Sequence, residues 1–362
     1  MREALGRVDQ GTYVEPSKIL VADYLRRWLD GIRVEPTTLA NYRRCDELYA
    51  IPTETPEGQP RPGIGRVPLQ KLTAEHLDAL YRYLEREGRR GGGPLKAKSV
   101  RHVHTMLRKA LQDAVERGYL LRNVADLAHP PSQKQARSRK ARDDVWTAEQ
   151  LRAFLRDVEG DRMYAAWLLF ATTGMRRGEV MGLEWTAVDL DAGRLKVAGT
   201  ITTVAGKLHR KQYPKTAAGE REFALDRATV AALRAHRARQ RRERLAAGPA
   251  WQESDLVFTR LDGRPVRPEW LLDTLKRRAQ TLSLPQIDIH GLRHSYVTAS
   301  LRAGVSPEVV QRRVGHAQVA TTLGMYAHVR REDDEHAAET VAGAILGIGT
   351  HSGPNVSSGG RQ

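Results

Sequence analysis

Residues 287–329 read IDIHGLRHSYVTASLRAGVSPEVVQRRVGHAQVATTLGMYAHV, and the interpretation of the whole chain starts from this stretch. Glycines and a Ser-Pro pair interrupt its apolar residues, which predicts several short helices rather than one long helix. We expect one helix over residues 291–302, a second between Ser306 and Gly315, and a third that begins near Val319.

The same stretch gathers side chains that can hold and attack a phosphate, namely His290, Arg293, His294, His316 and Tyr326. The planar fork of an arginine suits phosphate oxygens, and histidines add donors that can move protons near neutral pH. A tyrosine hydroxyl, with an ordinary pKa of about 10, needs positive neighbours or a base before it can act as a nucleophile. Taken alone, Tyr326 is better explained as a packed helix tyrosine, so its interpretation depends on the arginine and the histidines.

A zinc site is a competing interpretation, because His290 and His294 are four residues apart on one predicted helix. The zinc-protease pattern needs a glutamate directly after the first histidine, where this chain has Gly291, and Arg293 would repel a cation. The single cysteine, Cys45, excludes an internal disulfide and a cysteine-based zinc cluster. We therefore expect no metal and no cofactor.

The charge of the chain favours a polyanionic partner. The 362 residues carry a formal net charge of +16 at pH 7. Such a field concentrates phosphates, so nucleic acid is the expected partner, although a solvated arginine-rich surface has the same composition. The start of the chain lacks the apolar core of a signal peptide, and the longest apolar run, residues 165–171, is too short to span a bilayer. We expect a cytoplasmic, nucleoid-associated protein with no membrane contact.

The apolar pattern divides the chain into five parts. Four apolar stripes at helical spacing predict a helical domain, and they are followed by a basic linker and a second, mainly helical domain. The predicted parts are a lead-in at 1–18, the helical domain at 19–127, the linker at 128–145, the second domain at 146–346 and a flexible tail at 347–362.

The linker contains two prolines and a cluster of basic residues, namely Lys134, Arg137, Arg139, Lys140 and Arg142. An ordinary solvated linker explains this composition, but a basic linker between two domains of a basic protein can also follow a phosphate backbone. Both interpretations stay open.

Charged residues follow directly after a buried helix in the second domain. Residues 163–173 are apolar on nearly all sides and end at Gly174, and Arg176, Arg177 and Glu179 come next. Charges beside a buried helix need partners or a ligand, because an unpaired buried charge is costly.

From Arg194 the apolar residues no longer recur at helical spacing but at every second position. Alternating residues between Arg194 and Leu225 predict three short antiparallel strands, with Lys215 just before the last turn. The arginine-rich helix expected over residues 228–247 has a thin apolar stripe, which is typical of a solvated helix, and a further helix is expected over residues 268–281.

Taken together, these motifs resemble those of the tyrosine recombinases of the phage and mobile-element integrase family. The resemblance covers about residues 12–345, and its motifs occur in the family's order: TGMRRGE at 173–179, PKT at 214–216, HGLRH at 290–294, GH at 315–316 and ATTLGMYAHV at 320–329.

The resemblance implies a role for each motif residue. Arg176 and Arg293 would clamp the oxygens of the scissile phosphate, Lys215 would protonate the departing 5′ oxygen, and Tyr326 would become joined to the 3′ phosphate. His290 would be the better candidate for general acid/base work.

The remaining charged residues receive supporting roles. His316 would add a hydrogen bond, Glu179 would brace the arginines, and His294 and Arg177 are interpreted as structural.

The resemblance also implies the fold and the assembly. We expect a helical core-binding domain and a catalytic domain that is mostly α with a small antiparallel sheet. A homotetramer would act on two DNA attachment sites, assisted by accessory DNA-bending or excision factors. The apolar segment 341–348 would pack on a neighbouring subunit or, equally well, on its own. Many integrases of this type carry a further small domain that binds arm-type DNA sites. Residues 1–11 look like the last helix of such a domain whose strands are missing, so the resemblance does not extend to arm-site binding.

Two alternatives remain at this point. A DNA-binding protein that has lost catalysis would have no reason to keep the full set of motif residues. A type IB topoisomerase would use the same chemistry, but the linked helical domain and the sequence around Tyr326 favour recombination.

Overall fold

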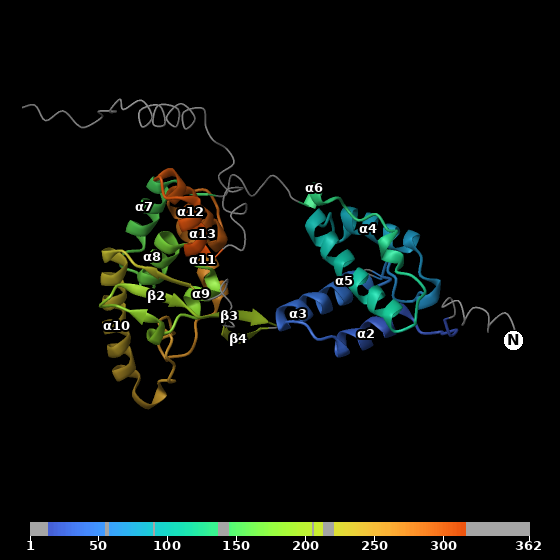
Figure 1. Cartoon of the computed structure of the whole chain (residues 1–362), viewed down its shortest axis with the longest axis horizontal. Helices are drawn as coiled ribbons and strands as arrows, with labels where there is room; N and C mark the ends of the chain where they lie inside the picture. Colours follow the sequence, from blue (N-terminus) through green and yellow to red (C-terminus); the bar gives the residue numbers. More distant parts are fainter. Residues whose placement is uncertain are drawn as a thin grey trace, which may run out of the picture. The chain divides into compact units, whose positions relative to one another are not determined.

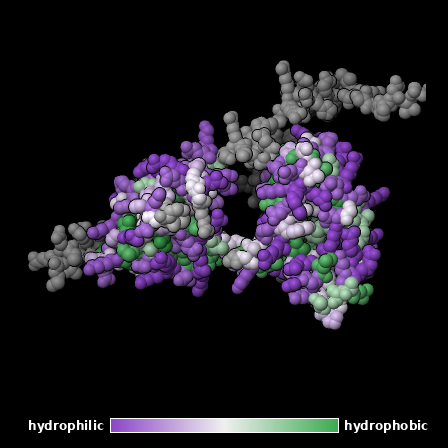
Figure 2. All heavy atoms as spheres, turned by 180° about the vertical axis from the view of Figure 1, so that it is seen from behind, coloured by the Kyte–Doolittle hydropathy of each residue, from purple (hydrophilic) through white to green (hydrophobic). Residues whose placement is uncertain are grey.

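The computed structural model describes residues 14–54, 58–89, 91–136, 145–204, 206–212 and 221–315. The chain divides into two compact units, one made mainly of residues 1–141 and one mainly of residues 142–362, and each is described by itself (Figure 1). No helix in the described ranges is long and apolar enough to cross a membrane. The face shown in Figure 2 is predominantly hydrophilic where its residues are described.

The first unit contains the four predicted helices, α2 Val21–Gly31, α3 Pro36–Cys45, α4 Ala74–Glu87 and α5 Ala97–Glu116. A π-helical turn (Asp46–Ala50) extends α3, and the short pieces Leu69–Lys71, Val124–Asp126 and α6 Gln133–Ala136 complete the unit. One face of α5 is buried along its length, as its apolar stripe predicts. The hydroxyl of Tyr24 donates to the carbonyl of Ala110 (2.7 Å), which ties α2 to α5.

Helix α4 ends at Glu87, with Gly88 as its C-cap, and stops before the run of glycines at residues 91–93. The backbone N–H of Gly88 donates to the carbonyl of Leu84, and a Cβ at residue 88 would lie 2.6 Å from that carbonyl oxygen. The tight turn therefore occurs at the first glycine available.

The second unit is mainly helical. Its helices are α7 Ala148–Asp157, α8 Tyr164–Thr173, α9 Arg177–Met181, α10 Arg227–Ala247, α11 Pro268–Thr281, α12 Ile289–Arg302 and α13 Pro307–Val314. Helix α8 is buried on nearly all sides, as predicted, and packs against α12 and α10. Figure 1 shows α7, α8, α12 and α13 gathered on one side of a small sheet.

The strands differ from the prediction of three in succession. Strands β1 Val188–Asp189, β2 Arg194–Val197 and β5 Arg221–Ala224 form a three-stranded antiparallel sheet in the order β1-β2-β5. Strands β3 Gly199–Val204 and β4 Lys207–Gln212 pair with each other as a separate hairpin. Strand β2 pairs with β5 because both place apolar residues on one face, where Leu195 lies opposite Phe223.

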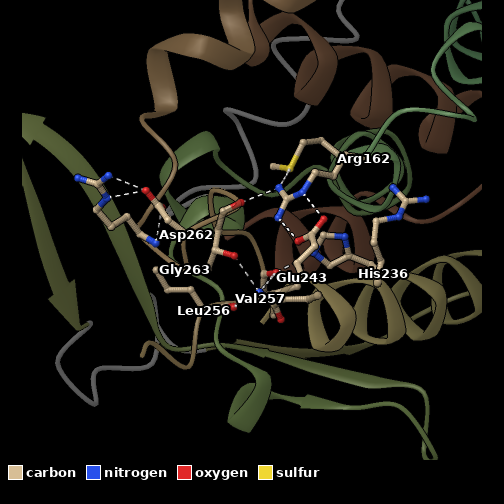
Figure 3. Close-up of polar contacts among 12 residues, drawn as sticks. Arg162, His236, Glu243, Leu256, Val257, Asp262 and Gly263 are labelled. Carbon is tan, nitrogen blue, oxygen red and sulfur yellow. Dashed lines mark hydrogen bonds and ion pairs between the residues drawn. The ribbon is translucent and has the colours of Figure 1, made fainter. Parts of the chain in front are cut away.

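Helix α10 buries polar residues in addition to the thin apolar stripe that the sequence predicts. Thr229, Leu233, His236 and Gln240 are its buried residues. Their polar side chains make hydrogen bonds: Nε2 of His236 lies 2.8 Å from the carbonyl oxygen of Val257, and Gln240 accepts from the indole of Trp185 (2.7 Å). Figure 3 shows this region. Burial here therefore depends on hydrogen bonds that hydrophobic periodicity does not reveal.

Candidate active site

The candidate site begins where α8 ends. Gly174 has a left-handed backbone (φ 62°), and a Cβ there would lie 2.5 Å from the ring of Tyr296, so the position requires glycine. This geometry lets the carbonyl of Gly174 accept a hydrogen bond of 2.7 Å from Nη1 of Arg293 on α12. The turn after the buried helix thus fixes the first arginine of the site.

Arg176 lies at the N-cap of α9 and is held from two sides. Its backbone N–H and its Nη1 donate to the two carboxylate oxygens of Glu179, each at 2.8 Å. Its Nη2 donates to the carbonyl of Gly315, also at 2.8 Å. The side chain remains 42% exposed, so the guanidinium is oriented and still reachable by a ligand.

Arg176 and Arg293 line the same pocket of about 300 Å³, together with His290, Asp288 and Arg177. Arg293 is almost fully buried, with 1% of its surface exposed. Arg177 also pairs loosely with Glu269 on α11 (3.8 Å). Residues more than one hundred positions apart in the sequence therefore place positive charge around one cavity.

Helix α12 carries both histidines of the HGLRH motif. It begins two residues earlier than predicted, because the carboxylate of Asp288 caps the N–H of Gly291 (2.8 Å). The rings of His290 and His294 meet edge to face, with centroids 4.5 Å apart. Partial burial, and then the charge of Arg293, lower the pKa of His290. Burial and the proximity of His290 lower the pKa of His294 to about 4. Both imidazoles are therefore neutral at pH 7.

Glu179 is buried and binds two arginines. Besides Arg176, it accepts from Nη1 and Nη2 of Arg221 at 3.1 and 2.7 Å. Burial alone would raise the pKa of Glu179, but the hydrogen bonds and charge of Arg221, together with the charge of Arg176, lower it to about 2. The carboxylate is thus ionised at neutral pH and orients both guanidinium groups.

Sequence reasoning missed Arg221. The residue is 8% exposed and starts β5, where the burial pattern places Arg221 and Phe223 on the inner face. An arginine at an inward position of an alternating strand was the available signal, because such a charge requires a buried partner.

Several predicted site residues lie outside the described residues, namely Lys215, His316, Tyr326, Arg137, Arg139, Lys140 and Arg142. Lys134 is exposed on α6. In the described ranges, no three His, Cys, Asp or Glu side chains are grouped so that they could hold a metal ion.

The described part of the site is a cationic pocket that is large enough to admit a phosphate group. Two guanidinium groups supply hydrogen-bond donors of fixed geometry, and a neutral histidine beside them can accept or donate a proton. Such an arrangement can stabilise the charge of a phosphoryl-transfer transition state.

Sequence comparisons match this chain to one family of proteins. The profile of the phage integrase family matches residues 144–333. A XerC-like tyrosine recombinase of Caldanaerobacter subterraneus subsp. tengcongensis is 26% identical, over 94% of this chain and 87% of that protein. An integrase of Streptomyces ambofaciens is 28% identical, over 90% of this chain and 80% of that protein.

Solved structures share the fold. The integrase of the transposon Tn1549, in complex with transposon right end DNA, superposes with a TM-score of 0.69 at 17% identity, over 90% of this chain and all of that one. A lambda integrase dimer bound to a COC′ core site gives a TM-score of 0.56 at 15% identity, over 92% and 86% of the two chains. The prediction of a mainly α chain with a small antiparallel sheet is therefore confirmed.

Proposed function

The chain belongs to the phage integrase family and is a site-specific DNA recombinase of the tyrosine type, and from this premise we propose that the pocket between Arg176 and Arg293 binds the scissile phosphate of duplex DNA. One observation carries the proposal: guanidinium groups from α9 and α12 line one cavity, each held by a backbone carbonyl. Donors oriented before the substrate arrives stabilise the transition state without reorganising during the reaction.

In the proposed reaction, the hydroxyl oxygen of Tyr326 attacks the phosphorus and the bond to the 5′ oxygen breaks. Lys215 gives a proton to that oxygen, which leaves as a 5′ hydroxyl. The 3′ phosphate stays joined to Tyr326, so the bond energy is conserved. Attack by a 5′ hydroxyl from another strand then releases the tyrosine and reseals the DNA, which allows integration or excision of a mobile element.

His290 is proposed to take the proton of Tyr326. The lowered pKa of His290 supports this role, because a neutral imidazole has a free nitrogen lone pair that can accept a proton at pH 7. His316 would donate a further hydrogen bond to the phosphate. Glu179 would act only by orienting Arg176.

The proposed assembly follows from the same premise. We propose a homotetramer on two DNA attachment sites, in which the helical unit at residues 19–127 and the catalytic unit at 146–346 both contact the duplex. Lys134 and the other basic residues of segment 128–145 would follow the phosphate backbone. Accessory DNA-bending or excision factors would set direction, and the protein would work at the nucleoid.

A covalent-adduct assay tests the reaction. The probe is a duplex with the sequence found at the junction between the mobile element and its host chromosome, nicked close to the cleavage position so that the released end diffuses away. Tyr326→Phe should bind this duplex as well as the parent does and form no adduct, because only the nucleophilic oxygen is removed. A normal adduct yield in Tyr326→Phe would exclude this tyrosine. Binding without any adduct by the parent would favour the inactive DNA-binding alternative.

A further inference from the structure

Arg221 is a buried arginine that links two parts of the second unit. Its Nη1 and Nη2 bind both oxygens of Glu179, and its Nε donates to the carbonyl of Arg313 at 2.7 Å. Three elements meet at this side chain, since Arg221 starts β5, Glu179 belongs to α9 and Arg313 lies in the last turn of α13.

The same carboxylate joins Arg221 to Arg176. Glu179 binds both guanidinium groups, and Arg176 reaches the carbonyl of Gly315 at the C-cap of α13. The two arginines, which share one carboxylate, thus donate to two carbonyls at the C-terminal end of α13, where the helix dipole favours positive charge. The next residue in the sequence is His316.

The end of α13 is shaped to fit Arg221. Gly315 has a left-handed backbone (φ 70°), and a Cβ there would lie 3.1 to 3.3 Å from the side chain of Arg221. Arg313 contributes from the other side, because its guanidinium lies over the ring of Phe223 and its Nε donates to the hydroxyl of Tyr296 (2.8 Å). Arg313 also donates from Nη2 to the carbonyl of Ala224 at 3.2 Å, so strand β5 fixes the helix end through both side chains and backbone.

The charge balance around Arg176 also depends on Arg221. One carboxylate shared by two guanidinium groups leaves one positive charge in the cluster. Without Arg221, the negative charge of Glu179 would cancel the positive charge of Arg176, and the cluster would be neutral. The buried carboxylate would also keep only one of its two arginine partners to compensate for its desolvation. The field that Arg176 presents to a phosphate would then be weaker.

We propose that Arg221 is a positioning residue for the phosphate clamp, which is the pair Arg176 and Arg293. It acts by holding Glu179 against Arg176 and by fixing the end of α13. The proposal rests on the proposed function, because it assigns Arg221 a part in DNA cleavage at the same site. Arg221 touches no substrate in this scheme. Its effect reaches the phosphate through Arg176 and through the residue that follows Gly315.

Arg162 offers a matched control. It is an arginine of the same unit whose Nε and Nη2 bind both oxygens of Glu243 (2.7 and 2.6 Å) and whose Nη1 donates to the carbonyl of Thr259, as Figure 3 shows. It does not line the pocket between Arg176 and Arg293. Arg162→Gln and Arg221→Gln therefore remove similar sets of bonds at different distances from the clamp.

The experiment measures single-turnover adduct formation by the full chain on the nicked junction duplex, with DNA affinity and thermal unfolding recorded for each variant. Arg221→Gln should lower the rate constant at least tenfold, with affinity within threefold of the parent. Arg162→Gln should lower the unfolding temperature and leave the rate constant of the folded fraction unchanged. Glu179→Gln should also lower the rate constant, and the double variant Arg221→Gln/Glu179→Gln should lose little more than either single variant, because both residues act on Arg176 through the same contact.

Three results would overturn the proposal. The first is a rate constant for Arg221→Gln within threefold of that for Arg162→Gln. The second is a variant in which fewer molecules react but the rate constant of those molecules equals that of the parent. The third is a loss in the double variant that equals the product of the two single losses, because that would show that Arg221 and Glu179 act independently. If Arg221→Gln does not fold, Arg221→Lys provides the same test, because lysine keeps the charge but cannot bind both oxygens and the carbonyl. Absence of adduct from the parent would refute the proposed function instead.

Discussion

At the scale of single residues, the two clamp arginines are oriented by backbone carbonyl groups and not by carboxylates alone. Arg293 donates to the carbonyl of Gly174, and Arg176 donates to that of Gly315. Both glycines have positive φ, so each carbonyl is turned by a conformation that other residues rarely adopt. The donors left for a phosphate are therefore held in place before it binds.

Arg293→Ala should slow adduct formation about 100- to 1,000-fold, which is the loss seen when one preorganised oxyanion donor is removed. Arg302→Ala is the control, because that exposed arginine lies in the last turn of the same helix. The measurement is the single-turnover rate on the junction duplex. Since Arg293 is buried, Arg293→Lys is measured alongside as a variant that keeps the charge. Cleavage by Arg293→Ala within tenfold of the parent would contradict the clamp.

The pH dependence of cleavage should identify the base. Because the pKa of His290 is lowered, its imidazole stays neutral below its ordinary pKa of about 6.5, and the rate should fall only when pH drops through the lowered value. His290→Gln should lose this acid limb and about 100-fold in rate. His294→Gln should keep the limb. The assay is the single-turnover rate between pH 5 and 8, and a limb lost in His294→Gln instead would reassign the base.

At the scale of elements, helices were predictable and strand pairing was not. The apolar stripe of α5 and the all-round apolar sequence of α8 are local signals, and both lie where the sequence indicated. The pairing of β2 with β5 depends on residues about thirty positions apart, and the hairpin between them interrupts any local pattern. Arg221 was missed for the same reason, because its partners Glu179 and Arg313 are distant in sequence.

The glycine at the end of α8 provides a test of element packing. Gly174→Ala should destabilise the protein by about 2–4 kcal/mol, since it combines left-handed strain of about 1–2 kcal/mol with a clash against the ring of Tyr296. Gly118→Ala is the matched control: its φ is 73° with open space around it, so only the strain should appear. Chemical denaturation measures both. Equal losses would show that the packing against Tyr296 is not needed.

At the scale of the whole molecule, the net charge of the chain acts on DNA binding, whereas the geometry of the clamp acts on DNA cleavage. The formal charge of +16 belongs to the entire chain, whereas the clamp uses a few arginines that are largely held by protein partners. Exposed charges release counterions from DNA when they bind, which makes affinity depend on salt. Partly buried groups in a fixed pocket are screened much less.

Salt should therefore change DNA affinity far more than cleavage. Raising salt from 50 to 200 mM should weaken binding of the junction duplex by Tyr326→Phe about 100-fold or more, as for proteins that neutralise several phosphates. Over the same range, the single-turnover rate of the parent at saturating protein should change less than about threefold, because the bound phosphate meets the same oriented donors. Gel-shift titrations give the first quantity and adduct formation gives the second. An affinity change below tenfold would favour the alternative that the arginine-rich surface is merely solvated. A cleavage rate that falls in parallel with affinity would show that mobile surface charge, rather than the clamp, stabilises the transition state.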